Sequence, residues 1–222
     1  MIDQANVHHT AFVDIKAVLG MNIKIGANAY IGPNVFLGDN CQVDSGAVLG
    51  ARPFELSISA AELFPIEIAT NAFIGSNVTI QYGIKGPTRI GADSWVNHNS
   101  AIGHDVHMGE HVHVGLCCSI SGYSKIGNHV KIGASSTLTN RSVIGNHARI
   151  GIGSLVLHPV EAGTTVLGRP AELRTQHLEA RKRMHALLGI ARKTRRITGG
   201  GSRIGRYLPI RLKNFIKHLL WK

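Results

Sequence analysis

Five histidines lie within a stretch of sixteen residues and are the clearest indication of chemistry in the chain. They are His98, His104, His107, His111 and His113. An imidazole titrates close to neutral pH, so it can remove a proton from a hydroxyl or an amine. His104 is followed directly by Asp105, whose carboxylate could hold the ring in one tautomer. This pair predicts general-base chemistry, and an exposed histidine without a function is the alternative.

The elements that must position these residues are indicated by a repeat of six. Aliphatic residues recur at every sixth position over residues 7–49, 68–80 and 90–156, in eight, three and twelve units. Four positions after each stands a small or branched residue, and glycine often follows the aliphatic residue directly. A period of six does not fit a helix with 3.6 residues per turn. It predicts short strands separated by corners, with glycine adopting backbone angles that other residues find costly.

A longer period, three times the first, indicates how these units stack. The run IGNHVKIG begins at Ile126, and the similar run IGNHARIG begins three units later at Ile144. Three units therefore form one triangular coil, and 23 units give seven to eight coils. Gly122 stands three units after His104 and should lie one coil away, at about 4.8 Å. Its backbone N–H could stabilise the oxyanion formed when a thioester is attacked, without a covalent acyl-enzyme.

Over residues 7 to 170 the repeats resemble the hexapeptide-repeat acyltransferases, which are left-handed parallel β-helices that assemble as trimers. The resemblance implies an all-β fold, a homotrimer, and sites in grooves between subunits. One run is similar to the bacterial sugar acetyltransferases of the sialic acid and bacillosamine type: Gly103-His104-Asp105, Gly109-Glu110, His113 and Ser121-Gly122. This implies that His104 is the general base, oriented by Asp105. It further implies that His113 lies in the same pocket and that Asn97 contacts the substrate.

The end of the repeat bears on the acyl donor. Gly168, Pro170 and Ala171 resemble the closing segment that lies near the adenine of coenzyme A in this family. A more distant resemblance is to the UDP-N-acetylglucosamine acyltransferase of lipid A synthesis, three of whose pocket histidines are replaced here by Ala101, Tyr123 and Thr139. The donor implied is acetyl-CoA, and the acceptor is a hydroxyl or amine of a sugar or nucleotide sugar in surface polysaccharide or lipopolysaccharide synthesis. An acyl carrier protein-dependent acyltransferase of the lipid A type and a non-catalytic trimeric scaffold are the alternatives.

Metal and thiol chemistry are disfavoured by spacing. A zinc carbonic anhydrase branch that resembles this fold binds its ion through three histidines, two of them five residues apart. No two of the five clustered histidines have that separation, so no metal is expected. Cys41 and Cys118 fall on the small inward position and are predicted to pack there, whereas Cys117 is undecided. His111, His129 and His147 follow one another at intervals of three units and predict a stacked ladder at the surface.

Two insertions interrupt the repeat. Residues 51–67 form a loop with three large apolar side chains, and residues 85–89 add a few positions around Gly86-Pro87. Insertions in a solenoid commonly lie over the binding face. Packing on a neighbouring subunit is the alternative interpretation.

The charge of the chain is concentrated after the repeat. The 222 residues carry a net charge of +11, of which the part up to Gly168 contributes −2 and the rest +13. We expect a β-helix domain over residues 1–170 and a basic helical extension over residues 171–222, with a glycine-rich break at residues 199–201. Beyond that break, basic residues oppose an apolar face, which suits contact with a membrane or packing in the oligomer. Nucleic acid is not expected, because no aromatic side chains are arranged for base stacking.

The location of the protein is predicted from what the sequence lacks. No apolar run approaches the roughly 18 residues that span a bilayer, and the first fifteen residues show no secretory signal. We therefore expect a cytoplasmic protein, with peripheral contact at the inner membrane face through the basic extension.

Overall fold

The computed structural model describes residues 7–54, 59 and 62–197. The chain divides into two compact units, Met1–Arg174 and Thr175–Lys222. The first holds the candidate site and every strand of the described residues.

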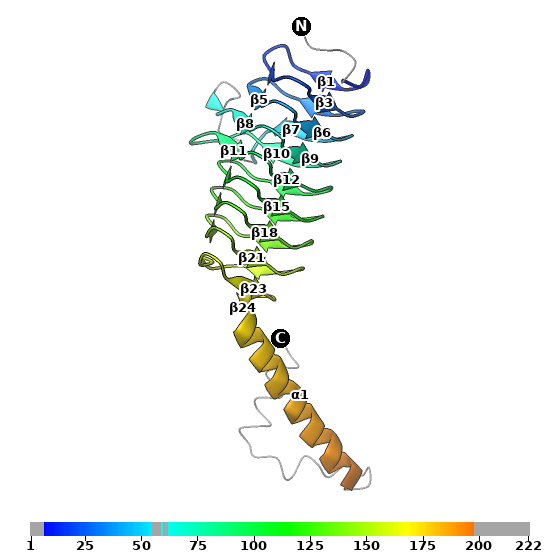
Figure 1. Cartoon of the computed structure of the whole chain (residues 1–222), viewed down its shortest axis with the longest axis vertical. Coiled ribbons are helices and arrows are strands. Elements are labelled where there is room, and N and C mark those ends of the chain that lie inside the picture. Colours follow the sequence, from blue (N-terminus) through cyan, green and yellow to red (C-terminus); the bar gives the residue numbers. More distant parts are fainter. Residues whose placement is uncertain (1–6, 55–58, 60–61, 198–222) are drawn as a thin grey trace. The chain divides into compact units, whose positions relative to one another are not determined.

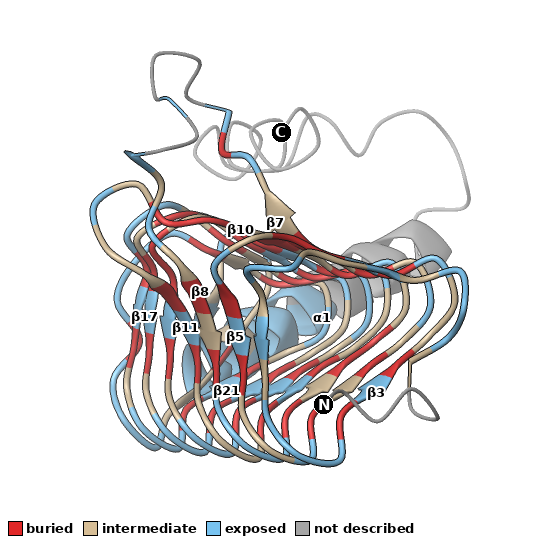
Figure 2. Ribbon diagram, turned by 90° about the horizontal axis from the view of Figure 1, so that it is seen from above, coloured by how far each residue is buried: buried red, intermediate tan, exposed pale blue. Residues whose placement is uncertain are grey.

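Three sheets form the three flanks of the first unit (Figures 1 and 2). Sheet I contains β1 (Phe12–Val13), β4 (Tyr30–Ile31), β7 (Val48–Ala51), β10 (Thr79–Gln81), β13 (Ala101–Ile102), β16 (Ser119–Ile120), β19 (Thr137–Leu138) and β22 (Leu155–Val156). Sheet II contains β2 (Val18–Leu19), β5 (Val35–Leu37), β8 (Ile66–Ile68), β11 (Thr88–Ile90), β14 (His107–Met108), β17 (Lys125–Ile126) and β20 (Val143–Ile144). Sheet III contains β3 (Lys24–Ile25), β6 (Gln42–Val43), β9 (Phe73–Ile74), β12 (Trp95–Val96), β15 (His113–Val114), β18 (Lys131–Ile132), β21 (Arg149–Ile150), β23 (Thr165–Leu167) and the antiparallel β24 (Glu172–Leu173). From β1 to β22, consecutive strands lie on different sheets, so the chain passes the three flanks in turn.

The strand register confirms the coil of three units. Ala101 pairs with Ser119, and His113 pairs with Lys131. Across the second insertion the paired residues stand four positions further apart, as Thr79 and Ala101 do. The fold is the predicted left-handed parallel β-helix, with about eight coils.

Two side chains of each unit fill the interior, as the repeat predicts. In the unit next to His104, Ile102 and Val106 are 1% and 0% exposed. Figure 2 shows buried segments recurring along each flank. Where the small inward residue is serine, its hydroxyl donates to a turn carbonyl, either in the next coil, as Ser100 does to Gly115 at 3.0 Å, or in its own coil, as Ser154 does to Gly151 at 2.7 Å. No buried side-chain nitrogen or oxygen of the described residues is left without a partner.

Apart from Gly50, which has φ of 114°, the glycines that follow the aliphatic residues do not have the backbone angles expected of them. Positive φ occurs two residues later, in the corners, as at Asn22 and Asn40 with φ of 55° and 58°. A Cβ on Gly38 would instead lie 2.7 Å from the backbone nitrogen of Thr70 in the next coil. Glycine is needed here because neighbouring coils approach closely, and the prediction of costly angles at this position was wrong.

The predicted histidine ladder is present on the corner between sheets II and III. The rings of His111 and His129 stack with centroids 4.7 Å apart, and those of His129 and His147 at 4.8 Å. The inward packing of Cys41 and Cys118 is also confirmed, since both are buried, and burial raises the pKa of each thiol. Cys117 is exposed.

Helix α1 (Arg174–Ile197) follows β24, as the spacing after Pro170 predicts. Its sequence carries eight basic residues and one acidic residue. Within the described residues, no helix combines the length and the apolar character needed to cross a membrane. The break at residues 199–201 and the amphipathic segment beyond it lie outside the described residues.

Candidate active site

His104 and Asp105 occupy the corner that follows β13, between sheets I and II. His104 Nδ1 lies 2.9 Å from Asp105 Oδ2. The His104 side chain is 20% exposed, whereas that of Asp105 is 6% exposed. The corner thus presents the imidazole to solvent and buries the carboxylate that holds it. Because Nδ1 faces the carboxylate, Nε2 is the nitrogen available to a substrate.

Asp105 is held by a cradle of backbone N–H groups from the second insertion. The N–H of Ile84 donates to Oδ2 at 2.8 Å. Oδ1 accepts from the N–H groups of Lys85 and Gly86 at 2.7 and 2.8 Å. Burial raises the pKa of the Asp105 carboxyl, but these donors and the His104 ring outweigh it, and the pKa lies below its ordinary value. The carboxylate therefore remains charged over the range in which an imidazole titrates.

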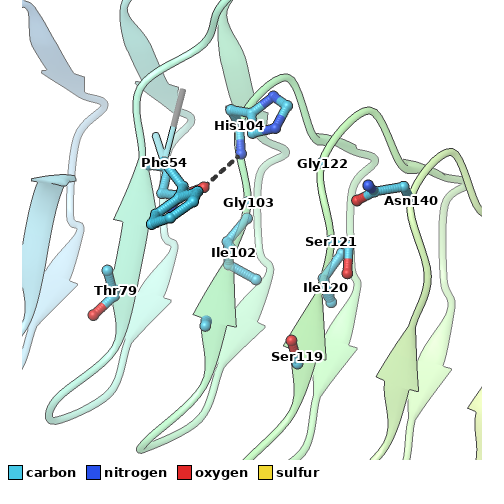
Figure 3. A pocket seen from close by; sticks show the side chains of 12 residues that line it. Phe54, Thr79, Ile102, Gly103, His104, Ser119, Ile120, Ser121, Gly122 and Asn140 are labelled. Atoms are coloured by element: carbon cyan, nitrogen blue, oxygen red, sulfur yellow. Dashed lines mark hydrogen bonds between the residues drawn. The ribbon is translucent and has the colours of Figure 1, made fainter. Parts of the chain in front are cut away.

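A buried threonine fixes the backbone of the same corner. Thr88 is 0% exposed, and its Oγ1 accepts the Asp105 N–H at 3.0 Å. The N–H of His104 donates to Gln81 Oε1 at 3.2 Å, the bond dashed in Figure 3. Thr88 belongs to the second insertion and Gln81 precedes it, so this insertion lies at the candidate site and anchors the His104–Asp105 pair.

Gly122 lies directly against the imidazole from the next coil. A Cβ on Gly122 would stand 2.5 Å from His104 Nε2 and 2.6 Å from Cε1. The backbone of Gly122 does not have a positive φ, so its conformation alone does not require glycine. A side chain is excluded here because the ring of His104 occupies the space.

The N–H of Gly122 has no acceptor among the described residues. In some coils the equivalent N–H is bound by a side chain of the following coil, as Glu110 N–H is by Asn128 Oδ1 at 2.9 Å. Asn128 N–H is bound by Asn146 Oδ1 in the same way, at 2.8 Å. The N–H of Gly122 has no such partner among the described residues, so it is available to a ligand next to His104.

A cleft of about 500 Å³ opens beside these groups (Figure 3). His104, Gly122, Ser121 and Asn140 line it, together with Phe54 from the first insertion. Both insertions therefore contribute to the candidate site. Gln81 and Asn140 were not predicted as site residues. Asn140 follows Gly122 by three units, as Gly122 follows His104, so continuing the same count by one more coil would have found it.

The remaining predicted residues are not brought to this cleft of the protomer. Asn97 lies in the corner after β12, where its Nδ2 donates to the Val114 carbonyl at 2.8 Å. His113 lies on β15 in sheet III, its ring stacked on that of Trp95 with centroids 5.6 Å apart. Neither residue lines the cleft on sheet I.

The predicted coenzyme A segment closes the last coil. Gly168 N–H donates to Ser154 Oγ at 3.3 Å, and Ala171 N–H donates to the Leu155 carbonyl at 2.7 Å. Pro170 is exposed. None of these three residues lines the His104 cleft. Among the described residues, no three His, Cys, Asp or Glu side chains are grouped so that they could hold a metal ion.

Residues 16–51 match the protein family described as the hexapeptide repeat of succinyl-transferase. That segment of the chain is therefore a hexapeptide repeat of this kind. LpxA from Acinetobacter baumannii shares 25% identity and a TM-score of 0.67 with it, over 79% of this chain and 77% of that chain. UDP-N-acetylglucosamine O-acyltransferase from Moraxella catarrhalis shares 24% identity and a TM-score of 0.61, over 97% and 91% of the two chains. No curated protein matches the sequence.

Replacing Thr88 with valine should lower kcat for a reaction at this site about tenfold or more and leave the KM values nearly unchanged. Valine has the same shape but accepts no hydrogen bond, so the buried Asp105 N–H loses its partner, at a cost of about 1–3 kcal/mol in unfolding free energy. A looser carboxylate also has a higher pKa, so the loss of activity should grow as the pH falls. Steady-state kinetics across pH and urea unfolding measure both effects.

Ser94 provides the matched control for Thr88. Its Oγ accepts a hydrogen bond from the N–H of Val112, in the next coil, at 3.0 Å. Ser94 does not line the cleft. Ser94→Ala should cost a similar unfolding free energy while the pH profile of kcat stays that of the unmodified chain. If both variants lose activity equally, Thr88 has only a structural role.

Proposed function

We propose that this protein is an acyltransferase that moves an acetyl group from coenzyme A to a hydroxyl or amine of a sugar or nucleotide sugar. The observation that carries the proposal is one arrangement: an imidazole held by a buried carboxylate, with an unused backbone N–H beside its Nε2. A general base and an oxyanion donor at one point are what direct acyl transfer requires. Acyl transfer by the structural relative LpxA supports the same reaction class.

The proposed reaction proceeds without a covalent enzyme intermediate. His104 Nε2 takes the proton from the acceptor as its oxygen or nitrogen attacks the thioester carbon. The carbonyl oxygen of the thioester becomes an oxyanion and accepts a hydrogen bond from the N–H of Gly122. When the carbon–sulfur bond breaks, the leaving thiolate takes the proton from the imidazolium. Asp105 stabilises that imidazolium through Nδ1 and remains ionised throughout.

We further propose that the enzyme acts as a homotrimer in the cytoplasm. The cleft lies open on sheet I of a narrow β-helix, and a second subunit would enclose it. Asn97 and His113 would then serve the cleft of a neighbouring subunit. Peripheral membrane contact is proposed through the extension that begins with α1, on the basis of its charge. Co-sedimentation with vesicles containing anionic lipid, compared with neutral vesicles, tests that contact.

The second candidate is acylation of UDP-N-acetylglucosamine from an acyl carrier protein. The resemblance to LpxA favours it. The alanine, tyrosine and threonine at positions 101, 123 and 139, where lipid A enzymes have pocket histidines, favour the acetyl-CoA reaction instead.

The proposed function is tested by incubating the full chain with acetyl-CoA and a panel of sugars and nucleotide sugars. We expect release of free coenzyme A thiol that depends on one acceptor class. Coenzyme A should also raise the melting temperature of the protein. A chain that neither releases thiol with any acceptor nor responds to coenzyme A is a scaffold, and the proposal is then wrong.

A further inference from the structure

The ring of Tyr123 lies against the imidazole of His104 from the next coil. The two ring centroids are 4.7 Å apart, and the ring planes are nearly perpendicular, at 87°. The backbones of the two residues are joined as well, since the N–H of Tyr123 donates to the carbonyl of His104 at 2.9 Å. Tyr123 does not line the cleft. It therefore contacts the proposed base without lining the space in which a substrate would bind.

Two cations hold the ring of Tyr123 in turn. Lys85 Nζ lies over the ring at 5.8 Å from its centroid, and the guanidinium carbon of Arg141 lies over it at 5.1 Å. Both distances fall within the range of about 6 Å over which a cation is attracted to an aromatic face. Lys85 belongs to the second insertion, and Arg141 follows Tyr123 by three units. The ring is thus fixed by two segments besides its own coil.

Lys85 connects both supports of the imidazole. Its N–H donates to Asp105 Oδ1 at 2.7 Å, and its ammonium lies over the ring of Tyr123. Asp105 holds Nδ1 of His104, and Tyr123 contacts the ring of the same histidine. The hydrogen bond from Asp105 fixes one nitrogen but leaves the ring plane free to tilt about it. An aromatic ring perpendicular to that plane restricts the tilt.

The backbone of Tyr123 carries a local cost. Twelve of the sixteen non-glycine residues with positive φ are Asn, Asp or His, the types that tolerate this conformation best. Tyr123 and Arg141, with φ of 59° and 61°, are the two large exceptions, and they are neighbours in one column. An asparagine at either position would avoid the cost. Residues held in such conformations cluster at functional sites, where the surrounding structure keeps them in place.

We propose that Tyr123 is a positioning residue for acyl transfer: its ring, clamped by Lys85 and Arg141, keeps Nε2 of His104 beside the N–H of Gly122. The inference rests on the proposed function and adds to it a residue that lies outside the cleft. The base and the oxyanion donor must stay at a fixed separation to act on one carbonyl group. A misplacement of about 1 Å can cost about a hundredfold in rate.

Steady-state kinetics of Tyr123→Asn and Tyr123→Phe test the role of the ring. Tyr123→Asn should lower kcat at least about tenfold, because the imidazole can tilt. The KM values should not change, since Tyr123 does not line the cleft. The melting temperature should also be nearly unchanged, because asparagine suits the backbone conformation. Tyr123→Phe keeps the ring and should keep normal turnover.

Ser135→Asn is the matched control. Ser135 is exposed, has φ of 58° and does not line the cleft, so asparagine enters the same backbone conformation at another corner. This variant should keep the kcat of the unmodified chain. An unchanged kcat in Tyr123→Asn would overturn the proposal. So would an equal loss in Tyr123→Phe, or a loss in Tyr123→Asn that is matched by a large fall in melting temperature.

A double-mutant cycle tests the clamp. Lys85→Gln removes the ammonium but keeps the backbone N–H that holds Asp105. It should lower kcat in the unmodified chain and lower it no further in Tyr123→Asn, because the cation acts through the ring. Additive losses would show that Lys85 acts independently of Tyr123 and would refute the clamp.

Nuclear magnetic resonance of the full chain labelled with ¹⁵N-histidine tests the positioning without turnover. The ring signals of His104 are those missing from His104→Ala. We expect one Nδ1–H tautomer in the unmodified chain and in Tyr123→Phe, and a mixture of tautomers in Tyr123→Asn. If no acceptor is acylated but this difference is found, only the proposed function fails. If acyl transfer occurs and Tyr123→Asn keeps the single tautomer and normal kcat, only the positioning role fails.

Discussion

Alanine in place of His104 should lower kcat by about a hundredfold to ten-thousandfold, the usual range for loss of a general acid–base group. The imidazole is the only titratable side chain of the described residues that lines the cleft. Without it, no group there can take the acceptor proton. The fold should be retained, because the hydrophobic interior and the ladder of backbone hydrogen bonds do not involve the His104 side chain.

The measurement is single-turnover and steady-state kinetics of His104→Ala beside His129→Ala. His129 is an exposed corner histidine stacked in the ladder between sheets II and III, so its truncation removes an imidazole far from the chemistry. His129→Ala should keep normal turnover. Near-normal turnover in His104→Ala, with both proteins folded by circular dichroism, would remove the general-base assignment.

Alanine at Gly122 should lower kcat about a hundredfold while the backbone N–H remains in place. The added methyl group would stand 2.5 Å from His104 Nε2, so the imidazole has to rotate away. The backbone conformation of Gly122 accepts alanine, because φ is not positive. The expected loss therefore comes from a misplaced base, and a misplacement of about 1 Å can cost that much.

A double-mutant cycle isolates this mechanism. If the methyl group acts by displacing the imidazole, Gly122→Ala should cost almost nothing further in a chain that already carries His104→Ala. Additive losses in the double variant would show that Gly122 acts independently of His104, through its N–H or through the fold.

The regular coils were predictable from sequence because they are translationally periodic. Neighbouring strands of a sheet are separated by a constant three units, so a count along the chain places Gly122 one coil from His104 and stacks His111 on His129. Residue types within one unit identify the inward positions, as for Ile102 and Val106. Sequence alone thus determined the β-helix, its approximate number of coils and the central juxtaposition of the site.

Tertiary structure decided everything that depends on where the period breaks. An insertion has no register, so counting cannot show that the N–H groups of Lys85 and Gly86 converge on Asp105 or that Phe54 reaches the cleft. Counting places His113 on the third flank, sheet III, but it does not reveal that the cleft is formed on sheet I. The physical reason is that periodic contacts are local to adjacent coils, whereas a loop adopts whichever conformation satisfies its own polar groups against the surface beneath it.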